Sequence, residues 1–525
     1  MLNKIRAYEP LLSKTLPILI FLLGLWYFCF RILGFGLEFV PGDLGDSRFI
    51  NFLLEHGYQW GVGNKASFWN AGFMYPYQDS IAFSDNMLGT MPFYGFWRLF
   101  GINQETSYQL WWITICSLNY WSAYFVIKRW FKRWDLAIIA AWIFAFTIFN
   151  LGQLSYMQMM IRFMVPIVIY SGVRLVETSS WKYFAIFLLG IVYQFYGVIY
   201  TGFFLMYFSA FFIVVYAIIQ KKYWFFVPLF KRKQLLQSST IIVVAVLSLG
   251  WLMLPYYEMS QVLEPRSFDE VKWSVPVLLS YFYPHESSDF WHILNVNCRP
   301  DVPLSWIHFT FPGMIPLVGL FSIPFLWIYW KIRRVQISKL IWTVSIATFI
   351  IFVFFVRTYD GQSFYAFMFE LPGVDSMRVI NRYMHVELFL IIIFIISLLT
   401  RMPKKWSVIL FLLVLLDNSF TEENLIRVSK KQIVERRETT INELKKEVKP
   451  SHEAYAILNS DEDFFLTQID GMTATNYIGL PTVNGYSSSC LPAFAPFYYK
   501  ADNESLQFWL KSNDIDSAKV LIIER

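Results

Sequence analysis

The sequence predicts an all-α polytopic membrane protein with about eleven transmembrane helices and a small carboxy-terminal α/β domain outside the cytoplasm. Hydrophobic residues make up 56% of the 525 residues and charged residues 16%, against about a quarter charged in soluble domains. Aromatic residues reach 20%, which suits a protein with many helix ends at membrane interfaces. Long apolar runs also alternate with short basic clusters.

The apolar runs give the positions of the predicted spans, and the last run is short for a bilayer. They lie near residues 16–36, 106–127, 134–153, 158–175, 182–199, 201–220, 239–257, 306–330, 339–356, 384–400 and 405–417.

Basic clusters between these runs predict the topology, because Lys and Arg mark the cytoplasmic ends of spans. Lys4, Arg6 and Lys14 precede the first run, so the amino terminus is expected in the cytoplasm. The transmembrane domain is then residues 1–420, with outer loops 38–105, 258–305 and 357–383, followed by a soluble domain at 421–525. That domain is outside if the run 405–417 spans the membrane and inside if it does not; we expect it outside.

The net charge of +6 belongs to these clusters and gives no support to nucleic acid as a partner. No Walker loop, G-x-S-x-G elbow or dinucleotide fingerprint is present, so nucleotide hydrolysis and esterase chemistry have no support.

The first outer loop begins with two carboxylates, Asp43 and Asp46, each shortly after a glycine that lets the chain turn tightly. Asp46 is suited to cap a helix over residues 47–58, which would lie in the membrane interface with Phe49 and Phe52 on its apolar side. Asp43 has no such structural role. A carboxylate at the water–lipid boundary suits a general base or a metal ligand, and spacing does not choose between them. If a divalent ion (Mg²⁺ or Mn²⁺) is bound, Asp43 and Asp46 are its expected ligands.

Cationic candidates lie in the third outer loop, where Arg378 and Arg382 are four residues apart and share a face of a helix if that helix begins early. Arginine binds phosphate oxygens bidentately, so a phosphate site is one interpretation. The other is a pair of interfacial arginines that contact Asp375 or lipid headgroups. Further candidate site residues are Asp79, Asp85, Arg357 and His385.

The carboxy-terminal residues show a charged helical stretch from Thr421 to Lys449 and two short apolar runs, at 464–466 and 520–523, that resemble strands. Asn484-Gly485 indicates a turn; the aromatics of that loop could contact a sugar, but a plain turn is preferred. Cys298 and Cys490 are both placed outside by the predicted topology, where a disulfide between them is one alternative and two free thiols the other.

The arrangement resembles the GT-C superfamily of membrane glycosyltransferases, distantly the protein O-mannosyltransferases and the aminoarabinose transferases. The residues that carry the resemblance, and place it near a branch of bacterial membrane proteins in that superfamily, are 42–69, 75–88 and 481–487. The resemblance implies a sugar donor on a polyprenyl-phosphate carrier, used at the outer face of a bacterial inner membrane. The acid of the superfamily's first loop maps to Asp43 or Asp46, and Asp43 is preferred. The Trp-Trp-Asp signature of oligosaccharyltransferases is absent, which argues against Asn-glycosylation.

The expected function is therefore an inverting glycosyl transfer to a cell-envelope glycan, lipid or protein. Asp43 would act on the acceptor hydroxyl or orient a metal, and Arg378 and Arg382 would hold the carrier phosphate. The alternatives are a transporter or flippase of lipid-linked glycans and a glycan polymerase or ligase. No inverted repeat is visible and charge within the spans is sparse, which weighs against transport.

Overall fold

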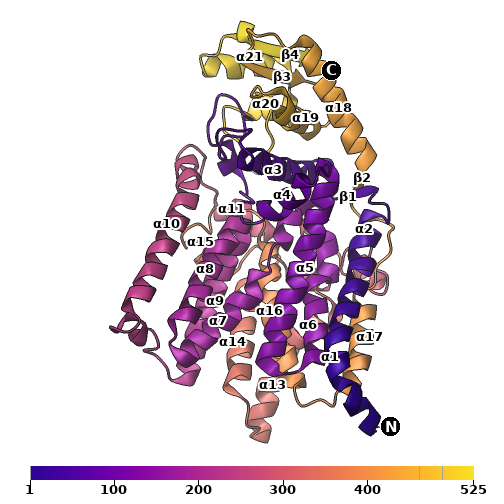
Figure 1. Ribbon diagram of the computed structural model, residues 1–525, viewed down its shortest axis with the longest axis vertical. Helices are drawn as coiled ribbons and strands as arrows, with labels where there is room; N and C mark the ends of the chain where they lie inside the picture. The colour runs from indigo at the N-terminus through magenta and orange to yellow at the C-terminus, as the bar shows by residue number, and fades with distance from the viewer. Residues whose placement is uncertain (1, 460, 488) are drawn as a thin grey trace.

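The computed structural model describes residues 2–459, 461–487 and 489–525. A helical bundle carries, at one end, a cap built from the first loop and the carboxy-terminal residues (Figure 1). The bundle helices are α1 (Leu2–Gly24), its continuation through a π-helical turn (Leu25–Phe30) into α2 (Arg31–Leu33), α5 (Gln104–Phe131), α6 (Trp134–Ala145), α7 (Met164–Thr178), α8 (Trp181–Gly197), α9 (Ile199–Gln220), α10 (Leu235–Ser260), α13 (Met314–Arg333), α14 (Lys339–Phe354), α16 (Met384–Leu399) and α17 (Lys405–Asp417).

Among the described residues, five helical segments are long and apolar enough to cross a membrane. They are Glu9–Leu33, Ile199–Gln220, Leu235–Ser260, Met314–Arg333 and Ile380–Leu399. The other predicted runs are helical too, but α7, α8, α14 and α17 have only 15, 17, 16 and 13 residues. A helix of 13 residues is about 20 Å long, against a hydrocarbon core of about 30 Å. The total of about eleven spans therefore stays a prediction.

The predicted span at 134–153 is not one straight helix. The helix α6 ends at Ala145, and 3₁₀ turns from Ile148 to Met160, interrupted by non-helical backbone at Tyr156, follow at an angle of 53°. Side chains from elsewhere bind the backbone groups freed by the break: Asn418 accepts the N–H of Ile148 at 2.8 Å, and Arg162 donates to the carbonyl of Phe144. Such partners are what allow irregular backbone at membrane depth.

The first outer loop folds into a short strand and two helices, β1 (Phe39–Pro41), α3 (Asp46–Gly61) and α4 (Met91–Leu99). The predicted helix after Asp46 is present. It does not expose a polar face to solvent, however, because every residue from Ser47 to Gly57 is buried. Its charged residues are paired: Glu55 accepts hydrogen bonds from the Tyr94 hydroxyl at 2.6 Å and from Arg98 at 2.8 Å.

The carboxy-terminal residues form β2 (Arg427–Ser429), α18 (Lys430–Glu447), β3 (Ala454–Leu458), α19 (Phe464–Ile478), α20 (Ala495–Lys500), α21 (Asn503–Ser512) and β4 (Val520–Glu524). The strand predicted near 520 is β4, which pairs with β3 in parallel. The strand predicted at 464–466 is wrong, because those residues begin α19. The predicted helix from Thr421 starts only at Lys430, after β2, which pairs antiparallel with β1.

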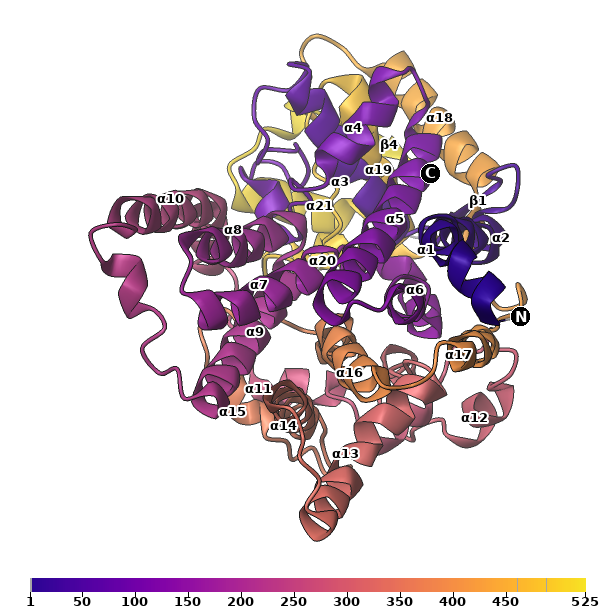
Figure 2. The ribbon, with the colours of Figure 1, turned by 60° about the horizontal axis from the view of Figure 1, so that its bottom comes forward.

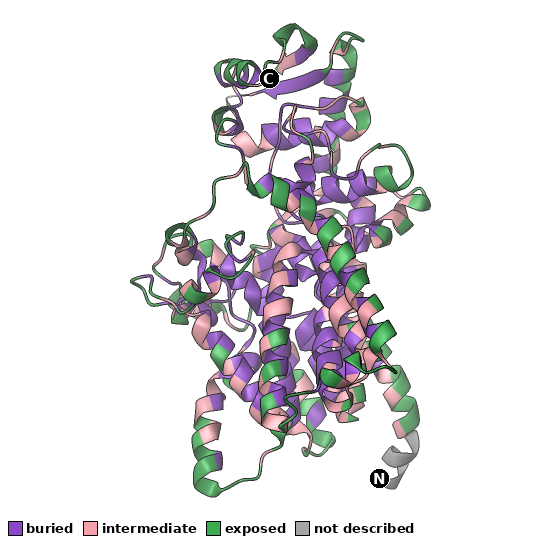
Figure 3. Ribbon diagram, turned by 90° about the vertical axis from the view of Figure 1, so that its left-hand side faces the viewer, coloured by how far each residue is buried: buried purple, intermediate pink, exposed green. Residues whose placement is uncertain are grey.

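Main-chain hydrogen bonds fix these carboxy-terminal residues to the first loop. The N–H of Thr482 donates to Gly72, and the N–H groups of Met74 and Tyr75 donate to Asn484 and Thr482. Buried residues continue from the interior of the bundle across this junction (Figure 3). The region 421–525 therefore lies at the same end of the bundle as the first loop. The loops 258–305 and 357–383, which the sequence predicts on the outer side, contribute the short helices α11 (Phe268–Val271), α12 (His292–Asn297) and α15 (Tyr365–Phe369).

Candidate active site

The two carboxylates of the first loop sit on the turn from β1 to α3, and Gly42 makes this turn possible. Its φ of +92° is in the left-handed region. A Cβ there would lie 1.9 Å from Oγ of Ser47 and 2.9 Å from the carbonyl oxygen of Leu154. Only glycine fits this conformation and this close approach.

Asp43 stabilises the first turn of α3. Its Oδ1 accepts hydrogen bonds from the N–H groups of Gly45 and Asp46, both at 2.8 Å. Asp46 is itself the first residue of α3, after an N-cap glycine that has no side chain to offer. The prediction that Asp46 caps the helix is therefore wrong. The capping oxygen comes from Asp43, three residues earlier, because Gly42 and Gly45 let the chain fold its carboxylate back onto these amides.

The Asp46 carboxyl is left free of main-chain partners and lies in a half-buried position. Its Oδ1 accepts a hydrogen bond from the hydroxyl of Tyr486 at 3.1 Å. Burial raises the pKa of Asp46 to about 7, helped by the charge of Asp43 and opposed by Tyr486 and by Arg382 and Arg378. Loss of hydration disfavours the charged carboxylate. Asp46 thus changes protonation near neutral pH.

Arg382 is a buried cation held between two aromatic rings. Its guanidinium carbon lies 4.6 Å from the ring centre of Tyr156 and 4.8 Å from that of Tyr200. Among the described residues, its Nε has no hydrogen-bonding partner. Stacking on aromatic faces orients the planar guanidinium and leaves its N–H groups directed outward from the stack.

Arg378 lies four residues earlier and is exposed, in irregular backbone before the 3₁₀ turn Ile380–Tyr383. The helix does not begin early enough for the two arginines to share a helix face. Its main-chain N–H donates to the Tyr200 hydroxyl at 2.8 Å, so the same tyrosine contacts both arginines. The charges of both arginines act on Asp46. The structure therefore brings together Asp43, Asp46, Arg378 and Arg382, which the sequence places in two separate loops.

A third carboxylate, Asp85, also belongs to this cluster. Its Oδ1 accepts the N–H of Ile199 at 3.0 Å. Burial raises the pKa of Asp85 to about 6, opposed by the Ile199 N–H, by Arg382 and by Gln158. Arg382 therefore acts on two carboxylates from different parts of the first loop.

Of the other three candidates from the sequence, Arg357 and His385 are engaged in local contacts. Arg357 donates from Nε to the carbonyl of Val275 and from one terminal nitrogen to that of Thr358, both at 2.9 Å. His385 is buried, with Nδ1 next to a terminal nitrogen of Arg162. Asp79 has a left-handed conformation (φ 52°) before a short 3₁₀ turn, and its side chain does not cap that turn.

Sequence reasoning missed the tyrosines of the site: Tyr156, Tyr200 and Tyr486. It took the segment around Asn484 as a plain turn, although that segment was among those that carried the family resemblance. Asn484 is buried, and its side chain bonds both the N–H and the carbonyl of Ile457, at 2.7 and 2.9 Å. It thereby anchors the segment to β3 and positions Tyr486, two residues later, over Asp46.

A metal at Asp43 and Asp46 would have two carboxylates from this chain. In the residues that the structure describes, no group of three or more His, Cys, Asp and Glu side chains is placed to hold a metal ion, and Oδ1 of Asp43 already accepts two N–H groups. Cys298 and Cys490 are both free thiols, so the disulfide alternative is wrong.

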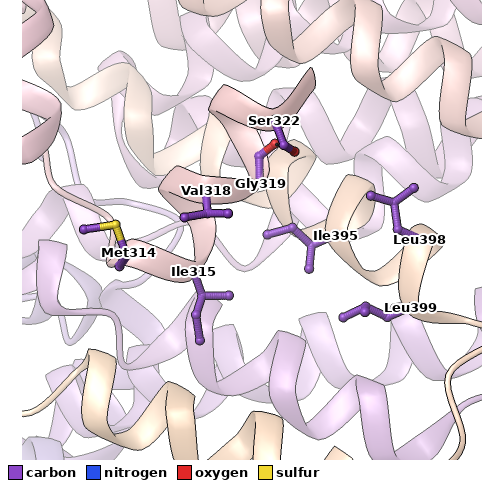
Figure 4. A pocket seen from close by; sticks show the side chains of 8 residues that line it. All are labelled: Met314, Ile315, Val318, Gly319, Ser322, Ile395, Leu398 and Leu399. Atoms are coloured by element: carbon purple, nitrogen blue, oxygen red, sulfur yellow. Dashed lines mark hydrogen bonds between the residues drawn. The ribbon is translucent and has the colours of Figure 1, made fainter. Parts of the chain in front are cut away.

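An apolar crevice of about 320 Å³ between α13 and α16 is separate from this cluster (Figure 4). Seven of its eight lining residues are apolar or glycine, and the eighth is Ser322. It has no charged group with which to hold a phosphate.

No family model matches the sequence, and no curated protein matches it either. Solved structures do match in fold. The arabinofuranosyltransferase AftD from Mycobacteria aligns over 92% of this chain with a TM-score of 0.53 and 11% identity. This chain spans 32% of the length of AftD. The archaeal oligosaccharyltransferase AglB from Archaeoglobus fulgidus aligns over 97% of this chain and 69% of its own, with a TM-score of 0.50 and 10% identity. The fold resembles that of the GT-C glycosyltransferases.

At these identities the likeness concerns the fold alone and leaves the chemistry to the site. ArnT from Cupriavidus metallidurans aligns over 99% of the chain with 9% identity and a TM-score of 0.35, too low to bear on the fold.

Proposed function

We propose that the protein transfers a sugar from a polyprenyl-phosphate donor to a hydroxyl group of a cell-envelope glycan, lipid or protein. The reaction takes place at the outer face of a bacterial inner membrane, with the amino terminus in the cytoplasm and residues 421–525 outside. The observation that carries the proposal is the environment of Asp46 on a GT-C-like bundle. Its carboxyl is partly buried and has a pKa of about 7, and the positive charges of Arg378 and Arg382 act on it.

Asp46 is the proposed general base. It takes the proton of the acceptor hydroxyl while the acceptor oxygen forms a bond to the anomeric carbon. The bond from that carbon to the phosphate oxygen breaks, and its electron pair leaves with the polyprenyl phosphate. One direct displacement inverts the anomeric configuration. A pKa close to the working pH suits this role, because the group is then deprotonated and still accepts a proton readily.

Asp43 is less suited to the role than the sequence alone indicates. One of its oxygens accepts two main-chain N–H groups, which fix the carboxylate on the turn, whereas Asp46 has no main-chain partner among the described residues. We therefore assign the base to Asp46 and assign Asp43 to holding the turn. The charge of Asp43 also raises the pKa of Asp46.

Arg382 and Arg378 are the proposed ligands of the carrier phosphate. Arg382 is held in place by its two tyrosines, and Arg378 lies at the exposed edge, where a lipid carrier can approach. Charge-assisted hydrogen bonds from arginine to phosphate are roughly twice as strong as hydrogen bonds between neutral groups. The AglB structure contains a dolichol-phosphate, a carrier of the class proposed for this protein.

The experiment is a transfer assay with purified protein and radiolabelled polyprenyl-phosphate sugars, each with a different sugar. Release of free polyprenyl phosphate together with a new labelled glycoside supports the proposal. Liposomes then separate the alternatives: a transporter or flippase moves the intact labelled donor across the bilayer and forms no glycoside. A polymerase or ligase forms a glycoside only when the acceptor is itself a glycan chain.

A further inference from the structure

The end of the bundle opposite the cap has a basic hollow that the proposed chemistry does not use. It has a volume of about 500 Å³ and lies where the carboxy-terminal end of α5 meets α1 and α6. Figure 2 shows these three helices side by side at this end. Its lining residues are Ser13, Phe125, Lys128, Arg129, Lys132 and Trp134.

The charges in this hollow are all positive. Lys128 donates to the hydroxyl of Tyr124 at 3.1 Å, and Arg129 donates to that of Tyr170 at 3.1 Å. Both partners are neutral, and an ammonium or a guanidinium has further N–H groups to donate. Lys132 is exposed. Within the described part of the chain, none of the three forms an ion pair.

The acids nearby are paired with other bases. Asp135 pairs with Arg133 at 2.6 Å, and Glu9 pairs with Lys404. Cytoplasmic positive charge on its own follows from the positive-inside rule. The rule explains the number of these cations, but it does not explain a hollow of ligand size between helices with three unneutralised cations on its wall.

The same hollow has an apolar side, formed by Phe125 and Trp134. Phe125 is 58% exposed on the surface of α5, one turn before Lys128 and Arg129. A ligand that fills the hollow therefore carries an anionic group and an apolar chain next to it. A free anion would use only the cations.

We propose that this hollow binds the phosphate headgroup of an anionic phospholipid of the cytoplasmic leaflet, with an acyl chain along Phe125. The phosphate contacts Lys128, Arg129 and Lys132. Basic pockets between transmembrane helices are suited to such headgroups, and each surface cation contributes about a five-fold factor in affinity. The proposal is independent of the glycosyl transfer at the other end of the bundle.

The test uses the full chain, purified in detergent and stripped of lipid. Binding of phosphatidylglycerol, phosphatidylcholine with the same chains, and inorganic phosphate is followed by native mass spectrometry and by melting temperature. Phosphatidylglycerol should bind and raise the melting temperature more than the other two. If phosphatidylcholine has the same effect as phosphatidylglycerol, the site does not select for charge. If inorganic phosphate has the same effect, the ligand is a free phosphate and not a lipid.

Two variants locate the site. Lys128→Gln with Lys132→Asn should weaken phosphatidylglycerol binding about 30-fold, since two cations are lost. Asn tolerates the left-handed conformation of Lys132 (φ 56°). The matched control, Lys231→Gln with Lys233→Gln, removes the same charge from exposed positions outside the hollow and should change binding less than two-fold. Equal losses in both variants would overturn the assignment to this hollow.

Phe125→Ala keeps every charge and changes an exposed residue. It therefore tests whether an acyl chain binds along Phe125, even if the double variant does not fold. It should weaken phosphatidylglycerol binding and leave binding of inorganic phosphate unchanged. Unchanged lipid binding would remove the acyl chain from the proposal.

Discussion

The hydroxyl of Tyr486 donates a hydrogen bond of 3.1 Å to Oδ1 of Asp46, although 440 positions separate the two residues in sequence. The ring of Tyr486 is held on both sides, by Tyr498 in a stacked arrangement at 6.3 Å and by Phe49 edge-on at 5.8 Å between ring centres. The carboxy-terminal residues therefore complete the surroundings of the first-loop carboxylate.

The first prediction separates the two carboxylates. Asp46→Asn should lower the transfer rate by about 10²- to 10⁴-fold, the usual effect of losing a general base. Asp43→Asn should retain most activity, because the amide oxygen of asparagine still accepts the N–H groups of Gly45 and Asp46. Rates with a labelled donor measure both. An inactive Asp43→Asn beside an active Asp46→Asn would restore the assignment made from sequence.

The second prediction concerns the pH dependence of the rate. In the wild type, kcat/KM should rise with pH through about 7 as Asp46 loses its proton. Tyr486→Phe removes a hydrogen bond that lowers the pKa of Asp46, so the rise should move to higher pH. Tyr499→Phe is the control, because its ring packs on Phe464 and Tyr498 and should leave the profile in place.

The third prediction needs no substrate. In the folded protein the pKa of Asp46 is about 7, above its ordinary value of 3.8, so the folded state binds more protons between these values. Its contribution to stability therefore falls as pH rises from about 4 to about 7 and is constant above. The melting temperature of Asp46→Asn relative to wild type should rise over that window. For Asp85→Asn the same rise should level off near pH 6. A pH-independent difference would contradict the raised pKa.

The fourth prediction concerns the contact between α19 and α3. Asp470 is completely buried and pairs with Arg48 at 2.6 Å, Arg436 at 2.7 Å and Arg525 at 2.9 Å. Asp470→Ala leaves the buried Arg48 unpaired and should destabilise the protein by about 3–5 kcal/mol. The control is the exposed pair of Lys519 with Glu453.

Glu453→Ala should change stability by only about 0–1 kcal/mol. Denaturant unfolding measures both variants, and limited proteolysis of residues 427–525 reports on detachment from α3. Equal stability of the two variants would show that the Asp470 cluster does not hold this contact.

The fifth prediction separates phosphate binding from structure among the arginines. Arg382→Ala should raise the KM for the lipid-phosphate donor roughly 10- to 100-fold, as expected for a lost bond to a charged group. Arg357→Ala should lower the melting temperature with little change in KM, because Arg357 binds main-chain carbonyls. If Arg357→Ala raises the KM for the donor and Arg382→Ala does not, the phosphate site must be assigned to Arg357 instead of Arg382.

The sequence by itself determined the membrane class and most of the helices. An apolar stretch in a bilayer has to satisfy its own backbone groups, so its length and composition are enough to predict a helix. The same reasoning failed at 146–147, where distant side chains, those of Asn418 and Arg162, replace the missing helical bonds. It failed again at 464–466, because a short apolar run fits a strand or a buried helix equally well.

At the site, the sequence determined which residues carry charge, and the tertiary structure decided what each charge does. Asp43 and Asp46 look alike in a local window, and capping seemed to belong to Asp46. Their roles differ because a glycine turn folds Asp43 onto two amides, while Tyr486 and Arg382, from segments hundreds of residues away, surround Asp46. Burial and neighbouring charges set a pKa, and both are properties of the folded chain.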